Sequence, residues 1–311
     1  MGKGIESFTI VGGGFGLYGY LPALFNVFGG GIILPEIYRK IINSRSELKQ
    51  FEGLIEWVHS TESALLKSAG VVIAITPRAQ LQMVQEIFNL DNVKKIIIEK
   101  PVAPTIDEAI KIFDNPILER KKIRVGYTFI YANWYPLLMG LVTRSSSAIK
   151  IVWNFKADHI AKCKETWKRY HSMGGGVLRF YGIHLIAVLA SLGYETVSRC
   201  RLEEIITNQP TDWEAAFCGN TLPQCIVSVS INSNNNEFMI IEIDKDGCEK
   251  PFYFTSTPFY NDNFIHGQDT RIHLLESLIK TFNYEDYYFN SLYQKINNLW
   301  NKVELSSVIN R

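Results

Sequence analysis

Short apolar runs recur in the first part of the chain, and helical patterns lie between them. The runs are residues 7–11, 29–34, 70–76, 93–98 and 121–128, and the helical patterns are 17–28, 46–52, 61–67, 79–88 and 106–113. Strands that alternate with helices predict a parallel sheet with right-handed crossovers. The alternation stops near residue 128. We therefore expect a doubly wound α/β domain over residues 1–128.

The first apolar run leads directly into the glycine turn Gly12-Gly13-Gly14-Phe15-Gly16. Strand, glycine turn and helix in this order are typical of dinucleotide-binding domains, because glycines let the backbone approach a pyrophosphate at a helix N-terminus. Gly12 and Gly14 fit the GxGxxG spacing. Position 17 is leucine, so Gly16 or Gly19 must replace the third glycine. The pattern predicts a Rossmann-like domain, with a purely structural tight turn as the alternative.

Both kinds of ribose-recognising residue follow the second predicted strand. An acidic residue at that point binds the ribose hydroxyls of NAD, whereas an arginine accepts the additional phosphate of NADP. Glu36 favours NAD, and Arg39 with Lys40 favours NADP. The sequence therefore predicts NAD(P) and leaves the choice open.

The fourth apolar run leads into Glu99-Lys100-Pro101, and the third ends in Thr76-Pro77. The carboxyl ends of parallel strands meet at one edge of a sheet, where open α/β sheets bind their ligands. We expect these residues, the glycine turn and Glu36 to converge there. Lys100 is a candidate site residue, with a solvated charge at the end of a strand as its alternative. Thr105 and Glu108 have the spacing of a capping box and predict the next helix.

Residues 129–311 are predicted to form an α+β domain with an open, mostly antiparallel sheet. The expected strands are 148–155, 199–206, 215–218, 224–231, 237–243 and 251–254, and the expected C-terminal helices are 268–282 and 285–299. Residues 232–236 and Asp246-Gly247 have the composition of turns, so we expect consecutive strands to pair antiparallel.

Three glycines, Gly174-Gly175-Gly176, precede an apolar helical pattern that contains His184. Glycines allow a sharp turn and close approach of the backbone to a ligand. A histidine on an apolar helix is more often a core residue than a catalyst. The glycines and the preceding cluster Trp167-Lys168-Arg169 favour the functional interpretation.

Composition excludes several classes of partner. The net charge of +1 gives no reason to expect nucleic acid or a membrane surface as partner. The five cysteines are scattered without CxxC spacing and predict reduced thiols, and no cluster has the spacing of a metal site. The first residues lack the apolar core of a signal peptide, and no apolar run is long enough to span a bilayer. We expect a cytoplasmic protein.

Together these segments resemble the glucose-fructose oxidoreductase / inositol dehydrogenase (Gfo/Idh/MocA) family. The resemblance rests on the glycine turn with residues 21–24, on residues 74–77, on Glu99-Lys100-Pro101, and on Gly174–Gly176 followed by Gly182-Ile183-His184. It implies hydride transfer between a nicotinamide and a sugar, polyol or nucleotide-sugar carbon. It also implies a homo-oligomer, a dimer or tetramer.

The resemblance places Lys100 beside the nicotinamide and the reacting hydroxyl, and makes His184 the general acid or base. Members usually have an aspartate four residues before this histidine, where this chain has Phe180, and a second acid where it has Ala187. Lys100 and Tyr181 are therefore expected to complete the proton relay. The alternative is a catalytically weak, cofactor-binding homologue that senses a ligand or binds a partner.

The expected substrate is a sugar or nucleotide-sugar, plausibly in polysaccharide or modified-sugar biosynthesis. Ile130 stands where the family commonly has an arginine, so Tyr131, Asn133 and Trp134 are expected to shape the sugar pocket. If the substrate is a nucleotide-sugar, its phosphates are expected to contact the basic side chains Lys156, Lys164, Lys168 and Arg169, with a solvated basic face as the alternative. The candidates for substrate binding are Tyr131, Trp134, Trp167, Lys168, Arg169 and His184.

Overall fold

The computed structural model describes residues 6–116, 120–144, 148–260 and 267–310. The segment in which we looked for a signal peptide lies mostly outside these residues. No helix in the described part of the chain is both long and apolar enough to cross a membrane.

The chain forms two compact units, and neither is continuous in sequence. The first comprises Met1–Val102, Lys111–Thr128 and Asp262–Phe289, and the second Ala103–Ile110, Phe129–Asn261 and Asn290–Arg311. These units differ from the expected ranges 1–128 and 129–311. The difference arises because helix α10 (Ile272–Lys280) packs against helix α1 (Leu21–Phe28), where Asn26 donates a hydrogen bond to Glu276 over 2.7 Å.

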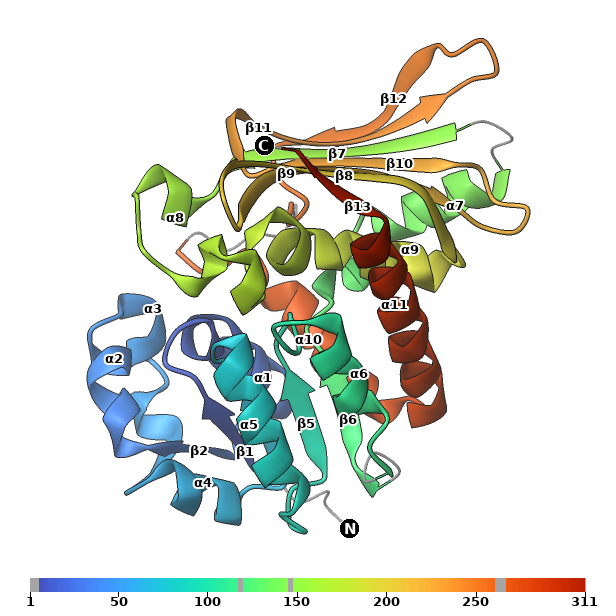
Figure 1. Cartoon of the computed structure of the whole chain (residues 1–311). Helices are drawn as coiled ribbons and strands as arrows, with labels where there is room; N and C mark the ends of the chain where they lie inside the picture. Colours follow the sequence, from blue (N-terminus) through green and yellow to red (C-terminus); the bar gives the residue numbers. More distant parts are fainter. Residues whose placement is uncertain (1–5, 117–119, 145–147, 261–266, 311) are drawn as a thin grey trace. The chain divides into compact units, whose positions relative to one another are not determined.

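A six-stranded, fully parallel sheet organises the first unit (Figure 1). Its order β3-β2-β1-β4-β5-β6 is that of a doubly wound dinucleotide-binding sheet. The strands are β1 Phe8–Val11, β2 Ile32–Pro35, β3 Ile55–Val58, β4 Gly70–Ile73, β5 Lys95–Ile98 and β6 Lys122–Val125. The sequence did not predict β3, because the exposed Glu56 interrupts its apolar pattern at the sheet edge.

The helices of the first unit follow the expected alternation with small shifts. They are a π-helical turn Gly16–Tyr20, α1, α2 Arg39–Asn43, α3 Ser46–Lys49, α4 Thr61–Lys67, α5 Pro77–Phe88 and α10. Helix α6, Ile106–Phe113, begins where the capping box predicts, since Thr105 Oγ1 accepts the Glu108 backbone N–H and donates to the Glu108 carboxylate.

The second unit is built on a seven-stranded mixed sheet of order β12-β11-β7-β10-β9-β8-β13 (Figure 1). Strands β7 and β10 pair parallel, as do β8 and β13, and the other neighbours pair antiparallel. The strands are β7 Ala148–Lys156, β8 Thr196–Ile206, β9 Gln209–Cys218, β10 Cys225–Ser230, β11 Asn232–Ile243, β12 Glu249–Thr255 and β13 Ser307–Asn310.

The predicted turn at residues 232–236 is wrong, as is the antiparallel pairing of β10 with β11. These residues belong to β11, which pairs with β7 through a break in register between Asn232 and Glu237. The buried Ile231 carries the chain past the end of β7, since its N–H bonds the Thr211 carbonyl and its carbonyl accepts the Ala157 N–H, both over 2.9 Å. A buried apolar connection therefore replaces the expected polar hairpin.

The helices of the second unit lie on one side of its sheet (Figure 1). They are α7 Tyr135–Arg144, α8 Asp158–Ala161, α9 Ile183–Leu192 and α11 Asp286–Ser306, with a π-helical turn Val177–Gly182 before α9. A Cβ at Gly182 would lie 2.8 Å from the Trp213 ring on β9, so this glycine allows the turn to pack closely on the sheet.

Candidate functional site

The glycine turn of the first unit has two kinds of glycine. Gly12 has φ of +136°, and a Cβ there would lie 2.2 Å from the Ala74 carbonyl oxygen, so only glycine fits. Gly14 is exposed, and a Cβ there would meet no atom within 4 Å. Its carbonyl accepts the Leu17 N–H over 2.9 Å and begins the helical turn. The turn thus leaves open space at Gly14, as close approach of a pyrophosphate requires.

The side chain of Tyr38 lies on the glycine turn. Its hydroxyl accepts the Gly12 N–H over 2.8 Å, and burial raises its pKa more than this hydrogen bond lowers it. Glu36 and Arg39 flank it and pair with each other over 3.3 Å, while the Arg39 guanidinium lies 4.7 Å from the Trp57 ring. Glu36 and Arg39, the residues predicted to decide between NAD and NADP, therefore form an ion pair with each other.

Glu99 is buried at the end of β5. Tyr20 donates a hydrogen bond to its Oε1 over 2.5 Å, and the Lys100 N–H reaches Oε2 over 3.2 Å. Burial raises the pKa of Glu99, and the charges of Lys100 and Arg271 and the Tyr20 hydrogen bond oppose this rise only in part. A Cβ at Gly126 would lie 2.5 Å from the carboxylate, so this glycine makes room for it.

Gln80 fixes the segment that carries Lys100, and the sequence analysis missed it. Its Nε2 donates to the backbone carbonyls of Glu99, Pro101 and Val102 over 2.6, 3.0 and 3.2 Å. It lies one turn into α5, which begins at Pro77 of the predicted Thr76-Pro77 pair, with Thr76 as its N-cap. No sequence pattern identifies this glutamine, because its three partners lie 19 to 22 residues further along the chain.

Arg271 is a second residue that the sequence analysis missed. Its guanidinium lies 4.0 Å from the centre of the Phe15 ring and forms two hydrogen bonds to the Asp269 carboxylate, over 2.8 and 2.7 Å. Phe15 in turn packs edge-on against Tyr20, with 5.5 Å between ring centres. The first unit thus brings together the glycine turn and Glu99 through Phe15 and Tyr20.

In the second unit, the three glycines approach the chain itself. A Cβ at Gly175 would lie 2.3 Å from the Trp167 carbonyl oxygen, and one at Gly176 would lie 2.9 Å from Pro210. Gly174 and Gly176 also have positive φ angles of +85° and +75°. Packing and turn geometry therefore explain the glycines without any ligand.

His184 lies buried on α9, with its ring stacked on Phe129 at 4.5 Å between centres. The same aromatic cluster buries Trp134 completely, and the Trp134 indole N–H donates to the Pro258 carbonyl over 2.9 Å. Trp134 is thus a core residue, which removes it from the ligand-facing candidates. Tyr131, half-buried, ends the 3-10 turn Thr128–Tyr131.

Phe180, which stands where the family usually has an aspartate, lies in an aromatic cluster. Phe180 packs edge-on against Trp167 at 5.2 Å and against Tyr181 at 4.7 Å. The Lys168 ammonium lies 5.1 Å from the Phe180 ring. Lys168 therefore faces an aromatic ring at this position instead of an acid.

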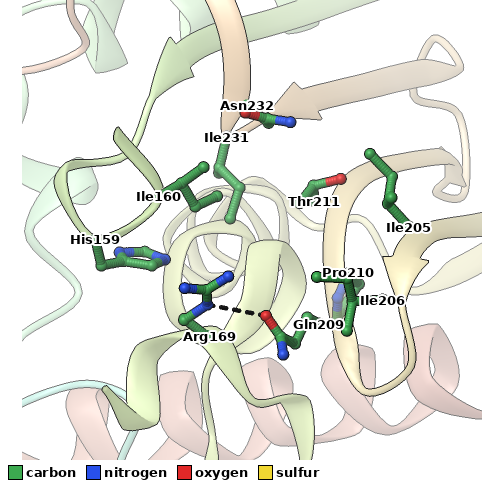
Figure 2. Close-up of a pocket in the computed structure, with 10 residues that line it drawn as sticks. All are labelled: His159, Ile160, Arg169, Ile205, Ile206, Gln209, Pro210, Thr211, Ile231 and Asn232. Atoms are coloured by element: carbon green, nitrogen blue, oxygen red, sulfur yellow. Dashed lines mark hydrogen bonds between the residues drawn. The ribbon is translucent and has the colours of Figure 1, made fainter. Parts of the chain in front are cut away.

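Tyr181 and Arg169 contact different partners. The Tyr181 hydroxyl lies 3.5 Å from Nδ1 of the buried His159, and Arg169 Nε donates to Gln209 over 2.9 Å. Arg169 and His159 both line a pocket of about 180 Å³ within the second unit (Figure 2). The described residues contain no cluster of histidine, cysteine or acidic side chains that would hold a metal ion.

Comparisons with known proteins show the fold. No protein-family profile matches the chain, and no curated protein matches its sequence. GenD2 from gentamicin A biosynthesis, solved with NAD, has a TM-score of 0.71 at 12% identity, over 98% of this chain and 96% of GenD2. WlbA dehydrogenase from Thermus thermophilus, solved with NAD and UDP-GlcNAcA, has a TM-score of 0.65 at 11% identity, over 97% and 95%. A mutant of Gal80p, described as a super-repressor, from Saccharomyces cerevisiae has a TM-score of 0.67 at 11% identity, over 97% and 96%.

Proposed function

We propose that the protein is an NAD(P)-dependent oxidoreductase that acts on a carbon of a sugar or nucleotide-sugar. The observation that carries this proposal is the glycine turn, where Gly12 is obligatory and Gly14 is open, at the topological switch of a sheet of order 3-2-1-4-5-6. The structures of GenD2 and WlbA, which are complexes with NAD, support the same ligand class.

The residues of the first unit fit this cofactor. The open backbone at Gly14 and the N-terminus of the following helix suit a pyrophosphate, and Glu36 suits the ribose hydroxyls. When bound, a nicotinamide donates or accepts the hydride. Lys100 would orient the reacting hydroxyl with its ammonium group, while Gln80 holds the backbone that carries it.

In the second unit, His184 would take or give the proton at Nε2, and Tyr181 would assist it. The His184 ring lies on α9, stacked on Phe129, and an imidazole is able to act as a general acid or base. Trp167 and Lys168, both half-buried, remain the candidates for contact with the sugar.

A titration with NADH and NADPH, followed by nicotinamide fluorescence, tests the cofactor. We expect Gly14→Asp to weaken binding at least about tenfold, since a carboxylate in the open space repels the pyrophosphate. Gly30→Asp is the matched control, because a Cβ at Gly30 also meets no atom within 4 Å. Equal binding by wild type and Gly14→Asp would contradict the dinucleotide site. Glu36→Ala and Arg39→Ala then show which ribose is preferred.

A second candidate function is a catalytically weak homologue that binds the cofactor and senses a ligand or partner. The replacement of the expected acid by Phe180, with Lys168 over its ring, favours it. Tight NADH binding with turnover of sugar substrates that is lost in Lys100→Ala and His184→Ala supports the enzyme. Tight binding without turnover supports the sensor.

A further inference from the structure

The second unit contains a pocket that neither the dinucleotide nor the proposed sugar chemistry requires. Figure 2 shows it between α8, the 3-10 turn that carries Arg169, and strands β8, β9 and β11. Its volume of about 180 Å³ exceeds that of a cavity of about 150 Å³ that binds benzene. Its lining residues are His159, Ile160, Arg169, Ile205, Ile206, Gln209, Pro210, Thr211, Ile231 and Asn232.

The lining of this pocket carries a positive charge that no acidic side chain balances. Arg169 is its only cationic lining residue, and no acidic side chain lines it. Among the described residues, the Arg169 side chain forms no ion pair, and its one hydrogen bond, from Nε to Gln209, leaves both terminal nitrogens of the guanidinium for a ligand. Two parallel N–H groups of a guanidinium match a carboxylate.

A buried imidazole lies beside this guanidinium. His159 is 4% exposed, and its Nε2 has no hydrogen-bond partner in the described part of the chain. Burial lowers the pKa of His159 to about 4, with a further contribution from the charges of Lys168 and Arg169. At neutral pH the ring is therefore uncharged, and Arg169 supplies the positive charge. An unbonded buried nitrogen costs free energy unless a ligand or water binds it.

Hydrogen bonds hold the walls of the pocket in place. Asn208, which turns the chain from β8 to β9 with φ of +65°, accepts the Ser172 N–H over 2.9 Å and donates to the Ser172 hydroxyl over 2.8 Å. Together with the Arg169–Gln209 bond, these contacts join the hairpin to the two successive 3-10 turns Trp167–Arg169 and His171–Met173. The pocket is thus preformed, which lowers the entropic cost of binding.

From this arrangement we propose that the pocket binds a small organic carboxylate with an apolar chain. The carboxylate pairs with the terminal nitrogens of Arg169, and the chain lies against the isoleucines Ile160, Ile205 and Ile231. Because His159 also lies 3.5 Å from the Tyr181 hydroxyl, the ligand would contact a neighbour of the proposed proton relay.

Equilibrium dialysis with labelled hexanoate, and with hexanamide as its uncharged analogue, tests the proposal. We expect saturable binding of hexanoate, with hexanamide about tenfold weaker, which corresponds to about 1.4 kcal/mol. Arg169→Gln should abolish the preference for hexanoate. Arg199→Gln, which removes an exposed arginine elsewhere on β8, should leave it unchanged.

Ile205→Trp provides a second variant if Arg169→Gln does not fold. Ile205 is 80% exposed, so the larger side chain narrows the pocket without disturbing the core, and hexanoate binding should fall. The proposal is overturned if wild type shows no saturable binding, if hexanamide binds as tightly as hexanoate, or if either pocket variant binds like wild type. None of these results depends on the dinucleotide.

Discussion

The hydroxyl of Tyr20 donates a hydrogen bond to Oε1 of Glu99 over 2.5 Å, and both side chains are buried in the first unit. This bond joins the π-helical turn after the glycines to the end of strand β5. Tyr20→Phe should therefore destabilise the protein by about 2 kcal/mol, because it removes a donor from a buried carboxylate. Urea unfolding measures the change. Tyr287→Phe, at a tyrosine that is 85% exposed, is the control.

Substitution by alanine should destabilise the protein at Gly12 and leave its stability almost unchanged at Gly14. Gly12→Ala should cost about 2 kcal/mol or more, since its Cβ would overlap the Ala74 carbonyl at a positive φ. Gly14→Ala should change stability by no more than about 0.5 kcal/mol. Thermal unfolding of the pair tests this expectation, and equal losses would contradict it.

Gln80→Ala should loosen the segment that carries Lys100. It leaves three carbonyls without their common donor, which should cost about 2 to 3 kcal/mol. Hydrogen exchange should increase around residues 99–102. The neighbouring Gln82 is exposed, so Gln82→Ala should leave exchange there unchanged.

Glu304 should give the protein part of its sensitivity to acid. Burial opposes ionisation of this side chain, but hydrogen bonds from His171 and Arg179 outweigh it and hold its pKa at about 2. A depressed carboxyl pKa stabilises the fold above the ordinary value near 4.5, and this contribution is lost as the pH falls towards 2. The loss should amount to about 3 kcal/mol.

Unfolding in urea between pH 5 and pH 2 tests this prediction, with these pH values chosen as roughly the limits of the titration. Glu304→Gln should be less stable at neutral pH and should lose less stability on acidification than wild type. An identical dependence on pH in both proteins would show that Glu304 does not titrate as described.

His159 should remain uncharged well below neutral pH. Its pKa of about 4 means that the imidazole protons seen by NMR should shift only near that pH. Arg169→Gln should raise the midpoint, because one of the opposing charges is removed, although burial, the largest cause, remains. A midpoint near 6.5 in wild type would contradict the burial of this ring.

Local patterns predicted much of the first unit. The apolar run and Pro101 placed Glu99 and Lys100 at the end of β5, and the Thr105–Glu108 spacing located the start of α6. Gln80 and Arg271 were not predictable, because their roles depend on partners distant in sequence. Likewise, composition suggested a turn at residues 232–236, but pairing with β7 makes them part of a strand.

The segment Asp262–Phe289 completes the first unit from far along the chain. Residues of this segment bury Arg124 of β6 fully: its side chain donates hydrogen bonds to Thr281 and Asp286, and its guanidinium lies 3.7 Å from the centre of the Phe289 ring. Domains generally fold as units while the chain is being synthesised. Here the ribosome must translate strands β7 to β12 of the mixed sheet before the partners of Arg124 emerge. During synthesis, the N-terminal parallel sheet therefore lacks helix α10 until most of the second unit has been made.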